Sequence, residues 1–178
     1  MMKIYEAMRF AAKHHKGQTR KGTGLPYVTH PIAVSYLLVR YKASKNLEDL
    51  IVAMILHDVL EDTSVTFLQL ARKFGPLVAS LVSELTNDPK QIALMGKLDY
   101  QTKKVLGISS WGLVCKLVDR LHNVMDQPSK KMVTDTVELM ARLKKGRKLT
   151  KTQKRIVADI EVECAKRLSA GAAEPAAA

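Results

Sequence analysis

Hydrophobic residues recur along most of the chain at the three- and four-residue spacing of an amphipathic helix. Alternation of apolar and polar residues, the pattern of a half-buried strand, never extends far enough to predict one. The helices predicted from this spacing cover residues 5–16, 31–38, 47–58, 66–74, 76–86, 111–124, 130–145 and 151–168. The sequence therefore predicts an all-α domain of about eight or nine helices.

Local signals mark several ends of these helices. Gly75 is expected to stop one helix, and Pro76 stands at the first position of the next, where its fixed φ is tolerated. Asn46 is predicted to cap the helix that follows it. Thr150 and Gln153 have the spacing of a capping box before the last helix.

Two stretches lack a clear helical pattern. Residues 87–97 are weakly patterned and are predicted to be the mobile segment of the chain. Residues 170–178 are alanine-rich and of low complexity, which predicts a disordered tail. We therefore expect one domain over residues 1–169, followed by this tail.

The composition is that of an ordinary soluble protein, with 47% hydrophobic and 26% charged residues among 178. No apolar run approaches the roughly 20 residues needed to span a bilayer, and the N-terminus lacks the pattern of a signal peptide. Cys115 and Cys164 lie far apart on apolar helical faces, so they are predicted to be core residues rather than a disulfide. A reducing cytoplasm is the expected location.

The net charge is +12, from 29 Lys and Arg against 17 Asp and Glu. Such a balance favours a polyanionic partner, which includes nucleic acids, nucleotides and phosphorylated metabolites. Much of the excess lies in residues 144–155, where a solvated helix end and loop is the more common interpretation. Three Phe, five Tyr and one Trp are too few for base-stacking platforms, so nucleic acid is not the favoured partner.

Residues 51–56 are fully apolar, and ionisable groups follow them at once: His57, Asp58, Glu61 and Asp62. A helix that is apolar on every side is a buried one. Polar groups at its end must be paired, bound to a ligand or solvated in a cleft, because burying them alone is costly. A divalent metal would satisfy an imidazole beside a carboxylate here. If the helix continues, both later acids lie on the same side as His57 and Asp58.

Two other segments carry residues of the same kind. His30 stands where a loop meets a helix, and Asp119 and Asn123 share one face of an otherwise apolar helix. Together with His57 and Asp58, these segments supply two imidazoles and two carboxylates, with positions left open for water. Such mixed ligation suits manganese, iron or cobalt and permits zinc, whereas magnesium prefers fewer nitrogens.

Four sequence motifs occur in a distinctive order: GQTRK at 17–21, PYVTHP at 26–31, HDVLEDT at 57–63 and KLVDRLHN at 116–123. They resemble the hydrolase domain of the RelA/SpoT homologues, over about residues 4–126. That HD-superfamily, all-helical domain removes the 3′-pyrophosphate from the alarmones ppGpp and pppGpp. With no room for a synthetase domain, the chain resembles a stand-alone small alarmone hydrolase, which would yield GDP or GTP plus pyrophosphate.

The resemblance implies roles for individual residues. It implies one Mn²⁺ per chain with four ligands, namely His30, His57, Asp58 and Asp119. Two acids would position and deprotonate the attacking water, namely Glu61 and Asp62. Four residues would line the nucleotide pocket, namely Arg20, Lys21, Tyr27 and Asn123.

Several alternatives remain open at this point. Asp126 stands where the family has a small hydroxyl residue, which bears on the substrate rather than on the metal. His122 is interpreted as structural rather than as a ligand of a second metal. Rival functions are another HD phosphohydrolase activity, such as NADPH phosphatase or 3′-nucleotidase, and a basic nucleic-acid-binding protein with a vestigial site. A homo-oligomer and a pairing with an alarmone synthetase, as its antitoxin, are also compatible with the sequence.

Overall fold

The computed structural model describes residues 2–172, and within them the secondary structure is helical apart from an isolated bridge between Thr19 and Pro26. The helices are α1 (Met2–His14), α2 (Thr29–Val39), α3 (Leu47–Ile55), α4 (Val59–Asp62), α5 (Phe67–Phe74), α6 (Pro76–Leu85), α7 (Pro89–Met95), α8 (Lys97–Gly107), α9 (Ser110–Met125), α10 (Lys130–Gly146) and α11 (Lys151–Ala172). The all-α prediction is confirmed. The segments α4, α7 and α8 add to the helices that the apolar spacing predicted.

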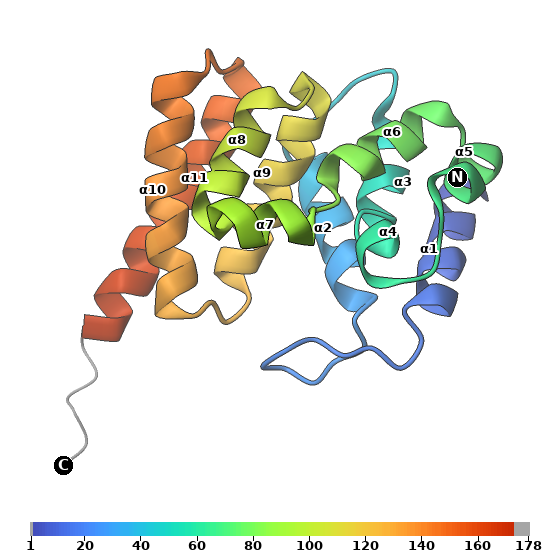
Figure 1. Ribbon diagram of the computed structural model, residues 1–178, viewed down its shortest axis with the longest axis horizontal. Coiled ribbons are helices and arrows are strands. Elements are labelled where there is room, and N and C mark those ends of the chain that lie inside the picture. Colours follow the sequence, from blue (N-terminus) through green and yellow to red (C-terminus); the bar gives the residue numbers. More distant parts are fainter. Residues whose placement is uncertain (1, 173–178) are drawn as a thin grey trace.

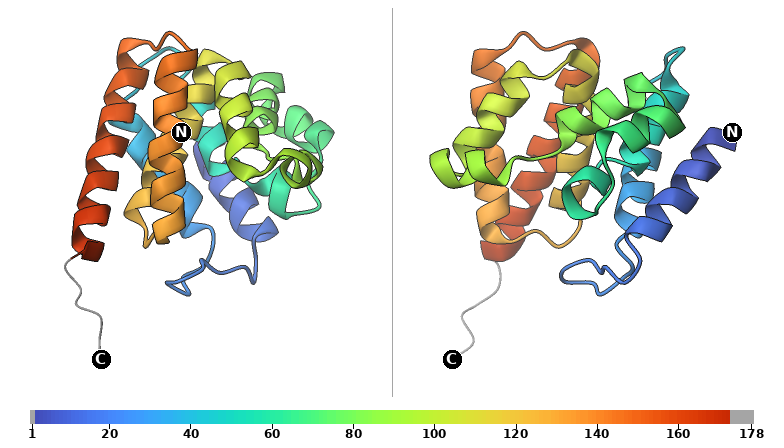
Figure 2. Two further views of the ribbon diagram at one scale, coloured as in Figure 1. Left: turned by 60° about the vertical axis from the view of Figure 1, so that its left-hand side comes forward. Right: turned by 45° about the vertical axis from the view of Figure 1, so that its right-hand side comes forward.

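Helix α9 lies between the two halves of the molecule (Figures 1 and 2). It packs against α2, α3 and α6 on one side and against α10 and α11 on the other. One continuous cluster of buried apolar side chains runs through both halves, from Val34 and Leu38 of α2 to Ile156 and Ile160 of α11. The middle of α9 is therefore the part of the chain where the N-terminal and C-terminal helices meet.

The stretch 87–97, predicted to be mobile from its weak pattern, contains α7 and the start of α8. Asp88 caps α7, because its Oδ1 accepts hydrogen bonds from the backbone N–H groups of Lys90 (2.9 Å) and Gln91 (3.3 Å). None of the residues of α7 is buried. A helix without core positions shows no apolar period, which is why the sequence pattern missed it.

The predicted caps differ in outcome. Thr150 and Gln153 form the expected capping box: the Thr150 N–H donates to Gln153 Oε1 (2.9 Å) and the Gln153 N–H donates to Thr150 Oγ1 (3.3 Å). Gln153 also donates to the Ser110 carbonyl, which fixes the start of α11 against the start of α9. Asn46 stands at the N-cap position of α3, but its side chain makes no capping hydrogen bond.

The helix predicted over 47–58 ends at Ile55, and this correction matters for the site. The Met54 carbonyl accepts from the side-chain Nδ1 of His57 at 2.7 Å. In a continuing helix that carbonyl would accept from the backbone of Asp58 instead. His57 and Asp58 therefore lie in a turn between α3 and α4, and Glu61 and Asp62 belong to the short α4 that follows.

At the C-terminus, α11 runs to Ala172, so the first residues of the predicted tail are helical. Residues 173–178 of that tail lie outside the described residues. The predicted domain of residues 1–169 therefore stays a prediction. No helix within residues 2–172 combines the length and the apolar character required to cross a membrane. Cys115 and Cys164 are free and buried, as predicted for core residues.

Candidate active site

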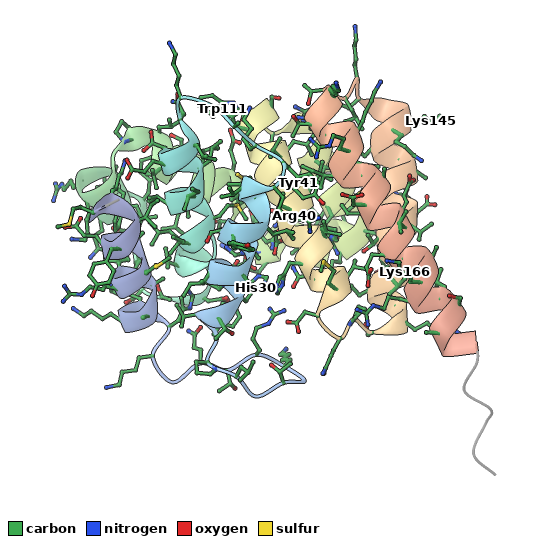
Figure 3. The ribbon with its side chains drawn as sticks, turned by 180° about the vertical axis from the view of Figure 1, so that it is seen from behind. His30, Arg40, Tyr41, Trp111, Lys145 and Lys166 are labelled. Carbon is green, nitrogen blue, oxygen red and sulfur yellow. The ribbon has the colours of Figure 1, made fainter. Side chains whose placement is uncertain are left out.

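The four predicted metal ligands come from three elements and converge beside α9. His30 lies in the first turn of α2, His57 and Asp58 lie in the turn after α3, and Asp119 lies in the middle of α9. The imidazoles are almost fully buried, with 3% of His30 and 2% of His57 exposed. Figure 3 shows His30 at the end of α2 that faces the loop before it. The fold thus brings all four side chains together.

The donor atoms lie close enough to share one ion. Nε2 of His57 is 2.9 Å from Asp58 Oδ2 and 3.7 Å from Asp119 Oδ1. Nε2 of His30 is 3.2 Å from Asp119 Oδ1 and 4.0 Å from Asp58 Oδ2. Ligand atoms at about 2.1 Å from a common ion lie about 3 Å apart when adjacent and about 4.2 Å apart when opposite. The spacing and the chemistry of these donors therefore fit a divalent transition metal.

Asp58 is the outermost of the four. The tightest group, with all three donor atoms within 4.8 Å of one another, consists of His30, His57 and Asp119. The Asp58 oxygen that faces the imidazoles also accepts a hydrogen bond from the Tyr27 hydroxyl at 2.6 Å. Tyr27 therefore holds a predicted ligand in place. Burial, followed by the nearby Asp58 carboxylate, raises the pKa of this phenol, so Tyr27 stays protonated and donates.

Hydrogen bonds at Nδ1, the ring nitrogen that points away from the carboxylates, fix the orientation of each imidazole. Nδ1 of His57 bonds the Met54 carbonyl at 2.7 Å, and Nδ1 of His30 lies 3.1 Å from Nδ1 of His122. A neutral imidazole carries one proton, so a proton on Nδ1 leaves the Nε2 lone pair free for a metal. The contact between His122 and His30 agrees with the structural interpretation of His122.

The charges within the cluster show which positive charge a metal ion would replace. Burial opposes charge on the His57 imidazole, but Asp58 and Asp119 outweigh it and raise the pKa of His57 to about 10. Burial likewise opposes the charge of Asp58, yet His57 lowers the pKa of Asp58 to about 2. Against the same effect of burial, hydrogen bonds with both imidazoles hold the pKa of Asp119 well below its usual range. A protonated His57 therefore offsets part of the negative charge of these two buried carboxylates, a role that a divalent cation would take over.

The two predicted catalytic acids are exposed and differ in their contacts. Both oxygens of Glu61 accept hydrogen bonds from Asn87, at 2.8 Å from its backbone and at 3.0 and 3.1 Å from its side chain. The Asp62 carboxylate accepts no hydrogen bond from the described residues, although the Asp62 carbonyl accepts one from Gln18. Partial burial, the Asp58 charge and the Glu61 charge raise the pKa of Asp62. Asp62 is thus the acid whose carboxylate is free of protein donors among residues 2–172, and its pKa lies above the ordinary value.

The predicted substrate residues are brought together only in part. Arg20 donates from Nη2 to Asn123 Oδ1 at 3.2 Å, and Asn123 donates from Nδ2 to Asp119 Oδ1 at 2.7 Å. These two residues and Tyr27 adjoin the metal cluster. Lys21 is exposed and forms no hydrogen bond or ion pair with any residue in the described part of the chain.

Comparison with known proteins shows the family of this chain. A family model described as an HD domain matches residues 7–104, which is more than half of the chain. The chain belongs to the HD-domain family. Its relatives include guanosine-3′,5′-bis(diphosphate) 3′-pyrophosphohydrolase MESH1 of Homo sapiens, 35% identical over 126 residues that make up 69% of this chain and 68% of that protein. The Drosophila melanogaster protein of the same name is 36% identical over 125 residues, 70% of this chain and 69% of that protein. These relatives confirm the resemblance inferred from the four motifs.

Other similar proteins are longer, or are known as structures. The bifunctional (p)ppGpp synthase/hydrolase SpoT of Escherichia coli K12 is 31% identical over 134 residues, 68% of this chain but 18% of that protein. A solved structure of a metazoan orthologue of SpoT, described as hydrolysing ppGpp, covers 94% of this chain and 96% of its own with a TM-score of 0.77 and 27% identity. A Listeria monocytogenes structure with a TM-score of 0.59, covering 80% of this chain and 99% of its own, is 20% identical and shows the fold alone.

Two contacts of this HD domain escaped the sequence analysis. Asn87 holds Glu61, but it lies in the stretch whose weak pattern predicted mobility. Gln18 connects the loop after α1 to Asp62 and also bonds Nδ1 of His15 at 2.8 Å. Gln18 belongs to the GQTRK motif, so the motif was the only signal that marked it. Neither pairing could be derived from helical spacing, because each joins segments far apart in the chain.

Proposed function

We propose that this HD-domain protein is a Mn²⁺-dependent hydrolase that removes pyrophosphate from the 3′ position of ppGpp and pppGpp, leaving GDP or GTP. The observation that carries the proposal is the convergence of two imidazoles and two carboxylates at metal-ligand spacing in a buried site. The relatives, which are named ppGpp 3′-pyrophosphohydrolases, support the choice of substrate.

His30, His57, Asp58 and Asp119 would hold the ion. When bound, Mn²⁺ supplies a positive charge that lowers the pKa of an attacking water and offsets the charge of the phosphates. The protein's part is to orient the ligands. Met54 and His122 fix the imidazoles, and Tyr27 and Asn123 fix the carboxylates.

Asp62 is our candidate for the general base. A base works best when its pKa approaches the working pH, and the environment of Asp62 moves its pKa upward from the ordinary value. Its carboxylate is free to take a proton from water, whereas Glu61 already accepts from Asn87. Glu61 would position the water. Its negative charge would also raise the affinity of the Asp62 carboxylate for a proton.

Arg20, Tyr27 and Asn123 would form the side of the pocket next to the metal, and Lys21 would meet the substrate from the loop. Phosphoryl transfer depends mainly on positioning and charge neutralisation, so a pocket of fixed polar groups beside an ion suits it. We place this activity in the cytoplasm, where it would lower alarmone levels. Homo-oligomerisation and pairing with an alarmone synthetase are further parts of the hypothesis.

The test is a substrate panel. Protein stripped of metal by a chelator and reloaded with Mn²⁺ is incubated with ppGpp, pppGpp, NADPH and a 3′-nucleotide, and released pyrophosphate and phosphate are quantified separately. We expect metal-dependent release of pyrophosphate from ppGpp and pppGpp. Phosphate release from NADPH or the 3′-nucleotide, with ppGpp left intact, would instead assign the rival phosphohydrolase activity to the same site.

A further inference from the structure

Asp126, the residue that ends α9, forms an ion pair with Arg20 of the loop between α1 and α2. Its Oδ2 accepts from Nε of Arg20 at 3.1 Å and from Nη2 of Arg20 at 2.7 Å. The side chains are only 25% and 15% exposed, so the pair is shielded from solvent. The hydrogen bond from Arg20 lowers the pKa of Asp126, although partial burial opposes this. Asp126 is therefore ionised at neutral pH, and it balances the charge of Arg20.

The backbone on both sides holds this pair together. Gly22, in the Arg20 loop, has φ +93° and lies so close to the turn after α9 that a Cβ there would be 3.0 Å from Oε1 of Gln127. Gln127 itself has φ 49°, a left-handed conformation that is uncommon for a residue other than glycine. The turn after α9 and the Arg20 loop are thus fitted to each other at the position of the ion pair.

The pair is connected to the metal cluster by two hydrogen bonds. Nη2 of Arg20 donates to Asn123, and Asn123 donates to Asp119. Asp119, Asn123 and Asp126 follow one another at helical spacing on α9, so they share one face. Arg20 therefore lies within reach of a group bound at the metal, and Asp126 fixes the direction in which it points.

The bonding of Arg20 limits what it can recognise. Nε and Nη2 donate to Asp126 and Asn123, whereas Nη1 donates to no partner among the described residues. A phosphate binds arginine best through two parallel hydrogen bonds, which Nη1 and Nη2 of Arg20 could offer only by releasing Asn123. It would then share the guanidinium with the Asp126 carboxylate, which already balances the charge of Arg20 and repels a second anion. An uncharged acceptor on Nη1 leaves both contacts intact and meets no such repulsion.

We propose that Asp126 is a specificity-determining residue, which withholds Arg20 from phosphate groups so that the pocket beside Asn123 receives an uncharged part of the substrate. The inference rests on the proposed function for the identity of that substrate. It acts through Arg20, so Asp126 is a positioning residue rather than a catalytic one.

The test compares Asp126→Asn with Asp99→Asn. The second variant removes the acid of an exposed Asp–Arg pair, with Arg142 of α10, and so matches the change in charge outside the site. Binding of inorganic phosphate to the Mn²⁺-loaded proteins is measured by calorimetry. We expect Asp126→Asn to tighten phosphate binding about tenfold, because it frees a guanidinium for charge-assisted bonds. Asp99→Asn should leave it unchanged.

Two further readouts make the result specific. In the double variant Arg20→Gln/Asp126→Asn the gain in phosphate affinity should vanish, because it depends on Arg20. For ppGpp, Asp126→Asn should raise KM several-fold while kcat stays within about twofold, because Arg20 is less well positioned for the bound substrate. An unchanged phosphate affinity, or a gain that persists without Arg20, would overturn the proposal. Phosphate binding requires no turnover, so this outcome is readable even if ppGpp proves not to be the substrate.

Discussion

The His–Asp cluster between α2, α3 and α9 and the basic junction between α10 and α11 (residues 144–155) both concentrate ionisable side chains, yet they differ in burial and in bonding. The cluster is assembled from three segments, and its imidazoles are almost inaccessible. The basic junction is one continuous stretch of sequence with seven Lys and Arg and no acid. Figure 3 shows Lys145 at the upper right of the molecule, away from His30 at the lower centre.

The side chains of the basic junction serve the fold or face solvent. Arg147 donates to the carbonyls of Val105 (2.9 Å) and Ile108 (2.8 Å) and so ties the turn after α10 to the end of α8. Lys144 pairs with Glu161 of α11. Four lysine residues are exposed, and their side chains form no hydrogen bond or ion pair within residues 2–172, namely Lys145, Lys148, Lys151 and Lys154.

The contrast between the cluster and the basic junction shows that a high density of charged residues along the sequence is a poor marker of a functional site. Solvated lysines cost little and contribute little, since water satisfies them. Buried imidazoles and carboxylates must satisfy one another or a ligand, because an unpaired buried charge is expensive. Convergence of separate segments on one buried position is therefore the stronger functional signal.

The largest expected effect comes from removing one residue of the cluster. His57→Ala should lower kcat/KM for ppGpp by roughly 10³-fold or more, because the ion loses a ligand and its charge is misplaced. The matched control is His14→Ala, which removes a partly exposed histidine from the end of α1. Activity within tenfold of the unchanged protein in His57→Ala would break the contrast between the two regions.

The next effect separates the two exposed acids. Asp62→Asn should lower kcat by about 10²- to 10³-fold with Mn²⁺ affinity retained, because it removes the proposed general base without removing a proposed ligand. Glu61→Gln should cost less, since an amide can still meet Asn87. Single-turnover kinetics and Mn²⁺ titration measure the two quantities separately. A greater loss in Glu61→Gln than in Asp62→Asn would exchange their roles.

A smaller effect is expected from pH on metal binding. The raised pKa of His57, about 10, means that Mn²⁺ must displace a proton from this imidazole throughout the neutral range. Affinity for Mn²⁺ should therefore rise about tenfold per pH unit between pH 6 and 8, whereas Asp58 is already ionised there and adds no dependence. Calorimetry at three pH values tests this, and buffers of different ionisation enthalpy count the released proton. An affinity independent of pH would contradict the coupling.

The smallest effect is expected at the basic junction. Replacing its four exposed lysines together by glutamine should leave kcat/KM for ppGpp within about twofold, because they lie far from the cluster and form no bonds that orient it. A loss above tenfold, with unchanged circular dichroism, would give the junction a role in substrate capture.

The amphipathic spacing was sufficient to predict the helices that bury a face, such as the one holding Leu117 and Leu121. It could not predict α7, which has no buried residue, or the turn at His57, where a side chain takes a backbone acceptor. The identities of the four cluster residues followed from motifs and resemblance. Their spacing of 3–4 Å, and the pairing of Arg20 with Asp126, arise only from tertiary packing.

We propose that one Mn²⁺ held by His30, His57, Asp58 and Asp119 is required for the hydrolysis of ppGpp. This requirement is tested most directly by measuring bound Mn²⁺ per chain and pyrophosphate released from ppGpp in the same preparations, as a stripped protein is reloaded in steps. We predict about one ion per chain, release proportional to occupancy, and loss of both in Asp119→Asn. Full release of pyrophosphate by stripped protein kept in chelator, or by Asp119→Asn without bound metal, would contradict the account.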